Sequence, residues 1–159
     1  MDFEIPIFVF FQLQLILQLL LAALLGGIIG LEREYKRKEA GLRTYSLVCL
    51  GSALFTMLSF EIFQEFNGTS GISFDPSRII QAIAIGVGFL GAGIIILRET
   101  RVEGLTTAAG LWLVAAIGVA VGAGFYFPAV FTTLIGVGIL TGLRLIEDKF
   151  FKKKNIEED

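Results

Sequence analysis

The sequence contains no histidine and a single cysteine, Cys49, among its 159 residues. Metal sites built from imidazole and thiolate ligands need several such side chains, so that kind of site is excluded. The usual residues of nucleophilic or metal-dependent catalysis are also missing, and we expect no enzymatic activity. Cys49 lies in an apolar segment, where we expect it to be buried as a small apolar residue.

Charged residues are scarce as well, at 18 % of the chain against about 25 % in an average soluble domain. The shortage is local, because four long segments contain no Asp, Glu, Lys or Arg: 5–31, 44–60, 79–97 and 104–143. A helix needs about 20 apolar residues to cross the hydrocarbon of a membrane. The chain is therefore predicted to be an integral membrane protein embedded in the lipid bilayer.

The last uncharged segment is too long for one crossing. Its 40 residues would extend about 60 Å as a single helix, twice the roughly 30 Å of the hydrocarbon core. Gly122, Gly124 and Pro128 indicate a turn in its middle. We predict an all-α bundle of five transmembrane helices, near residues 7–31, 44–63, 77–97, 105–121 and 127–144.

The basic residues indicate how these helices are oriented. Segments 32–43, 98–103 and 144–159 hold five, two and five of the 13 Lys and Arg residues, and only Arg78 falls on the other side. Lys and Arg accumulate on the cytoplasmic side of membranes. The sequence therefore predicts an external N-terminus and a cytoplasmic C-terminus.

The predicted spans also divide the chain. Residues 1–146 form the expected transmembrane domain, and residues 147–159 form a charged cytoplasmic tail. The Lys152–Lys154 cluster in this tail should favour anionic lipid headgroups by about 1 kcal/mol per charge. Acidic residues follow the cluster at once, so we expect no nucleic-acid partner.

Many of the 19 glycines lie four residues apart within predicted helices, as at positions 26/30, 118/122 and 138/142. Small residues at this spacing share one helix face and let two helix backbones approach closely. The simpler interpretation is packing inside one compact bundle. A homo-oligomer joined along such a face is the alternative.

The third predicted helix contains Gly86, Gly88, Gly91 and Gly93. Their spacing matches the GxGxxG pattern of dinucleotide-binding proteins, but that pattern requires a preceding strand, and this copy lies inside an apolar run. So many glycines instead indicate a closely contacted or distorted helix, which a membrane tolerates only where neighbours or a cavity satisfy the backbone. This helix is therefore a candidate functional element.

Charged and hydroxyl residues gather where three helices meet the predicted cytoplasmic face: Glu32, Arg33, Arg43, Thr106 and Thr107. Side chains at helix ends can simply reach water. Glu32 fits that explanation poorly, because the positive-inside bias does not favour an acidic residue. We expect Glu32 to pair with Arg33 or Arg43 between helices, and such pairs can mark a functional site. The sequence leaves a functional and a purely structural role open.

Asp75 and Arg78 flank the predicted start of the third helix on the outer side. We expect Asp75 to cap this helix, with Pro76 at its first position. Arg78 has two interpretations. The simpler one is a local ion pair with Asp75, Glu61 or Glu65, and the other is a side chain that faces the mouth of the bundle.

Many of these residues belong to blocks that resemble a known family. The blocks are Gly30–Glu34, Ala40–Thr44, Val48–Phe55, Ser77–Ile79, Gly88–Gly93, and Gly104–Ala109 with Trp112. Their content and order, over about residues 12–143, are similar to those of the MgtC/SapB family of bacterial membrane proteins. Several blocks in the right order make the resemblance more specific than any one motif.

The resemblance implies a multi-pass plasma-membrane protein tied to adaptation to low magnesium and, in some pathogens, to survival inside macrophages. It also implies a regulatory role, since one member acts on the proton-translocating ATP synthase. The chain looks like the short form, without the ACT-type soluble domain, and it has Tyr45 where the family commonly has histidine. By matching position, the residues carried over are Glu32, Arg33, Arg43, Arg78, Thr106, Thr107 and Trp112.

Two functions follow as hypotheses. The first is a regulatory membrane protein of magnesium homeostasis that contacts other membrane proteins. The alternative is a transporter or channel for magnesium or another ion. Magnesium prefers octahedral oxygen ligands, and the obvious carboxylates lie at the predicted membrane edges: Glu32, Glu34, Glu61, Glu65 and Asp75. We expect no bound cofactor, and the residues do not define a magnesium site.

Overall fold

The computed structural model describes residues 4–66, 75–98 and 101–143, and for residues 4–11, 96–98 and 101 it describes the backbone alone. Within these ranges, five helices are long and apolar enough to cross a membrane, which confirms the predicted all-α membrane fold. The predicted end of the fifth span at residue 144 and the tail at 147–159 lie outside the described residues.

Helices α1 (Glu4–Tyr35) and α2 (Leu42–Phe66) are the longest elements. The backbone of Arg37 is left-handed, with φ 52°, and it ends α1 sharply. The Arg37 amide donates to the Glu34 carbonyl (2.9 Å) and the Lys38 amide to the Arg33 carbonyl (3.0 Å). This pair of bonds is the usual way to close a helix with a left-handed residue.

Glu34 also connects the first two helices. Its carboxylate oxygen Oε2 accepts a hydrogen bond of 2.8 Å from the amide of Leu42, the first residue of α2. A negative charge is favourable at this position, because a helix N-terminus carries a partial positive charge and unpaired amides. One acidic side chain of α1 therefore fixes where α2 begins.

Helix α3 spans Ser77–Ile94 and is shorter than predicted. Ile95 has an extended backbone, and the chain continues into strands β1 (Ile96–Arg98) and β2 (Arg101–Glu103), which pair antiparallel. The prediction that the third span reaches residue 97 is therefore wrong. Consecutive β-branched isoleucines favour strand over helix, a signal hidden by the uninterrupted apolar run.

Helix α4 (Leu105–Gly122) and helix α5 (Tyr126–Gly138) divide the long uncharged segment, as predicted. Gly124 has φ 82° in the turn between them, a conformation that glycine adopts without strain. The chain continues from α5 into a π-helical turn at Ile139–Leu143. Such turns are rare and frequently lie near functional sites.

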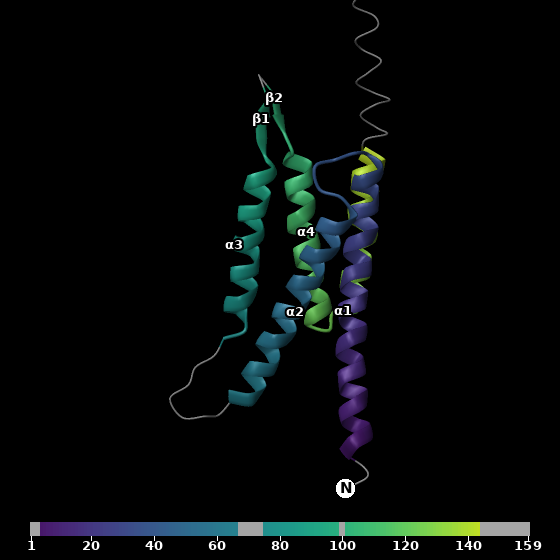
Figure 1. Ribbon diagram of the computed structural model, residues 1–159, viewed down its shortest axis with the longest axis vertical. Helices are drawn as coiled ribbons and strands as arrows, with labels where there is room; N and C mark the ends of the chain where they lie inside the picture. The colour runs from purple at the N-terminus through teal and green to yellow at the C-terminus, as the bar shows by residue number, and fades with distance from the viewer. Residues whose placement is uncertain (1–3, 67–74, 99–100, 144–159) are drawn as a thin grey trace, which may run out of the picture.

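Helix α4 lies at the centre of the bundle and packs against each of the other four helices. Figure 1 shows the α1–α2 loop, the β1–β2 hairpin and the end of α5 at one end of the molecule, which we call the hairpin end. The start of α1 and the end of α2 lie at the opposite end. The alternation of ends required by the predicted topology is present, whereas the assignment of the hairpin end to the cytoplasm stays a prediction.

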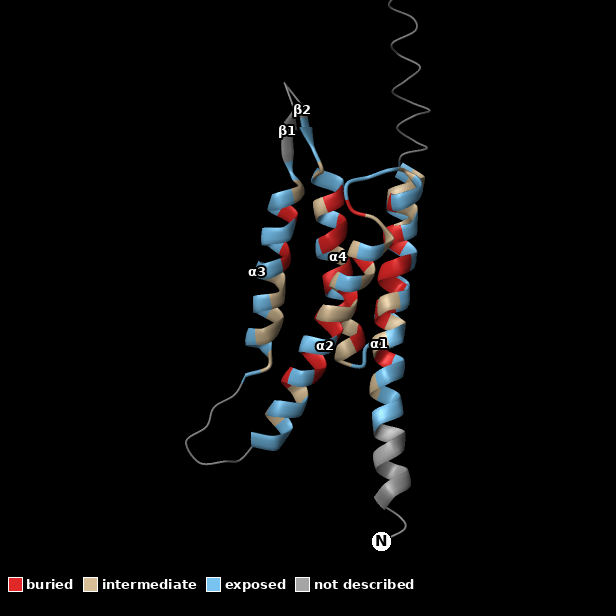
Figure 2. Ribbon diagram, viewed as in Figure 1, coloured by how far each residue is buried: buried red, intermediate tan, exposed pale blue. Residues whose placement is uncertain are grey.

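Small residues allow α1, α2 and α4 to pack closely. A β-carbon at Gly118 of α4 would collide with the Cys49 carbonyl of α2, and one at Gly26 of α1 would lie 2.6 Å from the Cys49 β-carbon. Cys49 itself is fully buried, as expected. The buried residues in Figure 2 accordingly concentrate on α1, α2 and α4. A β-carbon at Gly138 or Gly142 meets nothing within 4 Å, so those two glycines are not part of this packing.

The close contact between α4 and α2 generates a prediction about stability. We expect Gly118→Ala to lower the free energy of unfolding by about 1–3 kcal/mol, because the added methyl group pushes against the α2 backbone. Gly51→Ala in α2 is the matched control, since a β-carbon there meets nothing within 4 Å and alanine favours a helix. Thermal unfolding in detergent measures both variants, and equal midpoints would contradict the packing described here.

Candidate functional site

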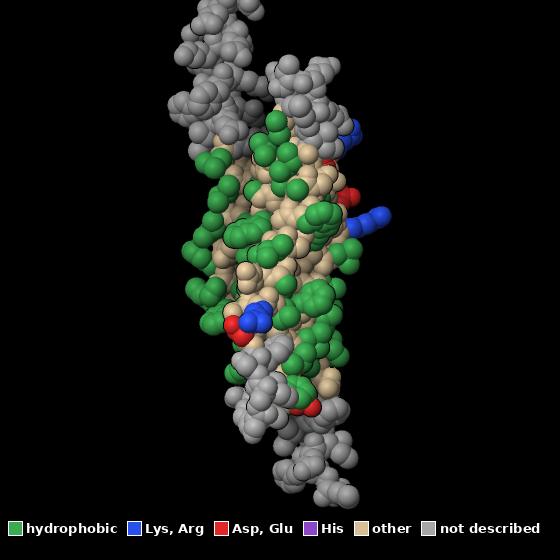
Figure 3. All heavy atoms as spheres, turned by 90° about the vertical axis from the view of Figure 1, so that its left-hand side faces the viewer, with side chains coloured by type: hydrophobic (Ala, Val, Ile, Leu, Met, Phe, Trp, Pro, Cys, Tyr) green, Lys and Arg blue, Asp and Glu red, His purple; other side chains and the backbone are tan. Residues whose placement is uncertain are grey.

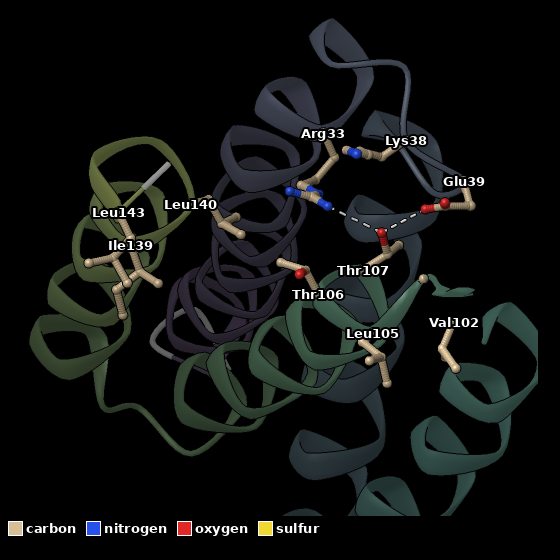
Figure 4. A pocket seen from close by; sticks show the side chains of 11 residues that line it. Arg33, Lys38, Glu39, Val102, Leu105, Thr106, Thr107, Ile139, Leu140 and Leu143 are labelled. Atoms are coloured by element: carbon tan, nitrogen blue, oxygen red, sulfur yellow. Dashed lines mark hydrogen bonds between the residues drawn. The ribbon is translucent and has the colours of Figure 1, made fainter. Parts of the chain in front are cut away.

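A chain of hydrogen bonds joins α1, α4 and the α1–α2 loop at the hairpin end (Figure 4). Arg33 Nη2 donates to Thr107 Oγ1 (3.2 Å), and the Thr107 hydroxyl donates to Glu39 Oε2 (2.8 Å). Arg33 and Thr107 are only 4 % and 1 % exposed. Because a buried charge is costly without partners, these bonds tie the position of Arg33 to the start of α4.

Arg33 also contacts an ion-pair cluster within α1. Its Nη1 lies 3.5 Å from Glu32 Oε2, and Glu32 Oε1 lies 3.0 Å from Lys36 Nζ. Of the two predicted partners of Glu32, Arg33 is confirmed and Arg43 is not. The expectation that the pair joins two helices is wrong, because Glu32 and Arg33 both lie in α1. Lys36 is one helical turn from Glu32 and reaches it without leaving the helix. Within the described part of the chain, Arg33 Nε has no hydrogen-bond partner.

Tyr45 of α2 holds the backbone beside the Thr107 hydroxyl. Its side chain is fully buried, and its hydroxyl donates to the Thr107 carbonyl oxygen (3.0 Å). The tyrosine ring lies against Gly110, where any β-carbon would collide with the Tyr45 hydroxyl. Thr107 is thus fixed by α2 through its backbone and by α1 and the loop through its side chain.

The left-handed end of α1 at Arg37 is followed directly by Lys38 and Glu39, which both line the pocket beside Thr107. The Glu39 carboxylate accepts hydrogen bonds from its own backbone amide and from Thr107, and these bonds hold its pKa below the usual value for a glutamate. The nearby charges of Lys38 and Arg33 act in the same direction. Glu39 is therefore a carboxylate at neutral pH, and the Thr107–Glu39 bond is charge-assisted.

These polar residues form one wall of a pocket of about 600 Å³ at the hairpin end. The other wall comes from Ile139, Leu140 and Leu143 of the π-helical turn, and it is apolar (Figure 4). The pocket is lined by Arg33, Lys38, Glu39, Val102, Gly104, Leu105, Thr106, Thr107, Ile139, Leu140 and Leu143.

The structure brings together some of the residues predicted for the inner face and not others. Arg33, Thr106 and Thr107 line the pocket, and Glu32 lies directly beside Arg33. Arg43 is exposed and makes no hydrogen bond or ion pair with the described residues. Its guanidinium lies outside the cluster in which we expected it.

Sequence reasoning missed Lys38, Glu39 and Tyr45. Glu39 could have been noticed in the sequence, since it is the acidic residue that directly follows the basic segment 36–38. Tyr45 could have been noticed as well, because it stands where the resemblance expects histidine. Neither feature indicates Thr107 as the partner, since the hydrogen bonds join residues 62 and 68 positions apart in the sequence.

At the opposite end, Asp75 and Arg78 are both exposed. Asp75 Oδ1 accepts a hydrogen bond from the Ser77 amide (2.9 Å), and the hydrogen bonds from Ser77 hold the pKa of Asp75 below its usual value. Asp75 thus satisfies an amide at the start of α3, although Pro76 is the cap residue and not the first helical residue. The expected ion pair of Arg78 with Asp75, Glu61 or Glu65 is wrong, because no such pair lies within 4.0 Å.

The glycines of α3 are neither closely packed nor associated with a distortion. A β-carbon at Gly91 would lie 3.4 Å from the Ala108 β-carbon of α4, an ordinary contact. At Gly86, Gly88 and Gly93 it would meet nothing within 4 Å. Because α3 is a regular helix from Ser77 to Ile94, the expected distortion is absent, and nothing in the described part of this chain packs closely on these three glycines.

The buried Arg33–Thr107–Glu39 chain generates a prediction about stability. We expect Thr107→Val to cost about 1–3 kcal/mol, because it keeps the shape but leaves a buried guanidinium donor without its acceptor. Thr106→Val is the matched control, since Thr106 is exposed and should change stability by about 0.5 kcal/mol or less. Chemical unfolding in detergent compares the two, and a Thr107→Val protein as stable as Thr106→Val would refute the role of this hydroxyl.

Comparison with known proteins places the chain among bacterial relatives. "Putative magnesium transporter YhiD" of Escherichia coli (strain K12) is 42 % identical over 127 residues, which cover 80 % of this chain and 59 % of that protein. Protein SapB of Bacillus subtilis (strain 168) is 41 % identical over 79 % of this chain and 56 % of SapB, and protein MgtC of Brucella abortus (strain 2308) is 44 % identical over 77 % of this chain and 48 % of MgtC. No solved structure matches.

The chain spans about half the length of these relatives. The profile of the MgtC family matches residues 19–149, a range that includes α2 to α5 and the pocket at the hairpin end. The identities above 40 % extend over most of this chain. On these matches, the chain belongs to the MgtC family.

Proposed function

We propose that this chain is a regulatory protein of magnesium homeostasis and low-magnesium adaptation in the bacterial plasma membrane, and that it acts by contacting other membrane proteins. The link to magnesium rests on the family and on the printed name of the E. coli relative. The mode of action rests on α3, where Gly86, Gly88 and Gly93 are not contacted within the bundle.

The contrast between two sets of glycines carries this proposal. In α1 and α4, a β-carbon at Gly26 or Gly118 would collide with α2, so these positions are fully used for internal packing. In α3, a β-carbon at Gly86, Gly88 or Gly93 meets open space. Helices associate in a membrane through close packing of small residues, because lipid provides no hydrophobic drive for their association.

Helix α3 is also the least buried of the five candidate spans. Only 11 % of its residues are buried inside the molecule. Phe89 on this helix is 80 % exposed. Figure 3 shows that the face of the molecule on the α3 side is covered largely by hydrophobic side chains. A transmembrane helix of another protein fits this surface by chemistry, with Phe89 beside the small residues as an anchor.

Helix α3 is connected to the pocket at the hairpin end through the hairpin that follows it. Helix α3 continues into the β1–β2 hairpin, and Val102 of β2 lines the same pocket as Arg33 and Thr107. A change at the polar wall of this pocket therefore acts on the element that follows α3. We assign Glu32, Arg33, Thr106 and Thr107 to this regulatory region and α3 to partner contact.

A growth experiment tests the contact through α3. We expect Gly88→Leu to abolish rescue of a deletion strain in limiting magnesium, because the larger side chain prevents close approach of a partner helix. Gly138→Leu in α5 is the matched control, since a β-carbon there also meets nothing within 4 Å, and it should rescue fully. Membrane levels of both variants are compared by immunoblot.

Full rescue by both variants at equal membrane levels would contradict the use of α3. A photoreactive amino acid at Phe89 then identifies the partner in magnesium-starved cells. The family resemblance makes the proton-translocating ATP synthase the first partner to examine. If Phe89 crosslinks only to a second copy of this chain, the role of α3 is formation of a homo-oligomer and not contact with another protein.

Transport of magnesium is the competing function, and the printed name of the E. coli relative favours it. Among the described residues, no group of three or more His, Cys, Asp or Glu side chains is placed to hold a metal ion. The purified chain in liposomes decides between the two functions with a magnesium-sensitive dye inside. Magnesium influx that is lost in Glu32→Gln would make transport the function.

A further inference from the structure

The pocket at the hairpin end has the composition of an anion site. Arg33 and Lys38 contribute two positive charges to its lining, and Glu39 contributes one negative charge. The Glu39 carboxylate is already engaged by the Thr107 hydroxyl at 2.8 Å. The excess positive charge disfavours a metal cation in this pocket and favours a negatively charged ligand.

The start of α4 adds to this positive character. The helix has 18 residues, its cap residue Gly104 supplies no side-chain hydrogen bond, and its first helical bond runs from the Ala108 amide to the Gly104 carbonyl (2.8 Å). The preceding amides, of Leu105, Thr106 and Thr107, have no acceptor within the helix. Amides at a helix N-terminus, together with the helix dipole, favour phosphate groups.

Arg33 provides the second and independent indication of a ligand. Its side chain is 95 % buried, its guanidinium faces the pocket in Figure 4, and its Nε has no hydrogen-bond partner in the described part of the chain. Buried donors are nearly always paired in proteins. Since guanidinium groups recognise phosphate oxygens through two parallel hydrogen bonds, the pocket-facing side of this guanidinium is a fitting partner for an incoming phosphate.

The apolar wall identifies what carries the phosphate. Ile139 and Leu143 of the π-helical turn, together with Leu105 of α4, line the pocket opposite the polar residues and are themselves more than half exposed. A free phosphate ion has no apolar part that could contact this wall. The pocket volume of about 600 Å³ lies within the roughly 300–1,000 Å³ that ligand sites occupy, which leaves room for glycerol and the start of an acyl chain.

We propose that this pocket binds the phosphate group of an anionic phospholipid, with Arg33, Lys38 and the N-terminal amides of α4 holding the phosphate and the π-helical turn holding the first acyl carbons. The evidence for this site does not rest on partner contact through α3. It gives the chain a means to respond to the headgroup composition of its own membrane at the hairpin end.

Native mass spectrometry of the purified full chain tests the proposal. We expect one phosphatidylglycerol to stay bound per chain and phosphatidylcholine to be lost under the same conditions. Lys38→Gln should weaken retention of phosphatidylglycerol about fivefold, the effect of one basic residue near an anionic lipid surface. Arg43→Gln removes another exposed charge, which lies outside the pocket, and should leave retention unchanged.

Two further measurements make the test decisive. Arg33→Lys keeps the positive charge but loses the planar fork of donors, and we expect weaker retention than in the wild type at unchanged secondary structure by circular dichroism. Inorganic phosphate and glycerol 3-phosphate are added as competitors. Equal retention in wild type, Lys38→Gln and Arg33→Lys would overturn the site, and full displacement by inorganic phosphate would overturn the lipid assignment.

Discussion

The close approach of α4 to α2 is the contact on which the rest of this structure depends. In a membrane, apolar side chains gain little by leaving lipid for a helix interface, so the helices associate where their backbones come close. Here Gly118 and Gly122 remove the side chains that would separate α4 from the carbonyls of Cys49 and Ala53. The Tyr45 hydroxyl then bonds to the Thr107 carbonyl near the other end of the same interface.

This contact also makes the polar cluster possible. Thr107 lies on the first turn of α4, and its position is set by how deeply α4 sits between α1 and α2. Only at this depth can its hydroxyl accept from Arg33 and donate to Glu39. A buried guanidinium without those partners would be strongly unfavourable, so the packing of small residues and the burial of Arg33 depend on each other.

Helix α3 follows a different rule from the rest of the bundle. It contacts α4 through Gly91, opposite Ala108, while a β-carbon at Gly86, Gly88 or Gly93 would meet nothing within 4 Å. The bundle therefore separates a tightly packed centre of α1, α2 and α4 from a helix with a free apolar face. Helices with few internal contacts are the ones that move or exchange partners at low cost, which is the property that regulation by contact requires.

The sequence alone determined the class of the protein and its spans. Uncharged segments of about 20 residues match the length of a membrane-spanning helix, in which every backbone amide and carbonyl can bond within the segment. That constraint gave the five helices, the turn near Gly124 and the separation of the basic segments from the rest of the chain.

Only the tertiary structure decided which residues meet at the hairpin end. Arg33 and Arg43 are alike in the sequence as basic residues at helix ends, yet Arg33 is buried against Thr107 and Arg43 is exposed. The rotation of each helix about its own axis determines which of the two arginines is buried. This rotation follows from the fit of glycines on one helix against the backbone of the next, which no property of a single segment contains.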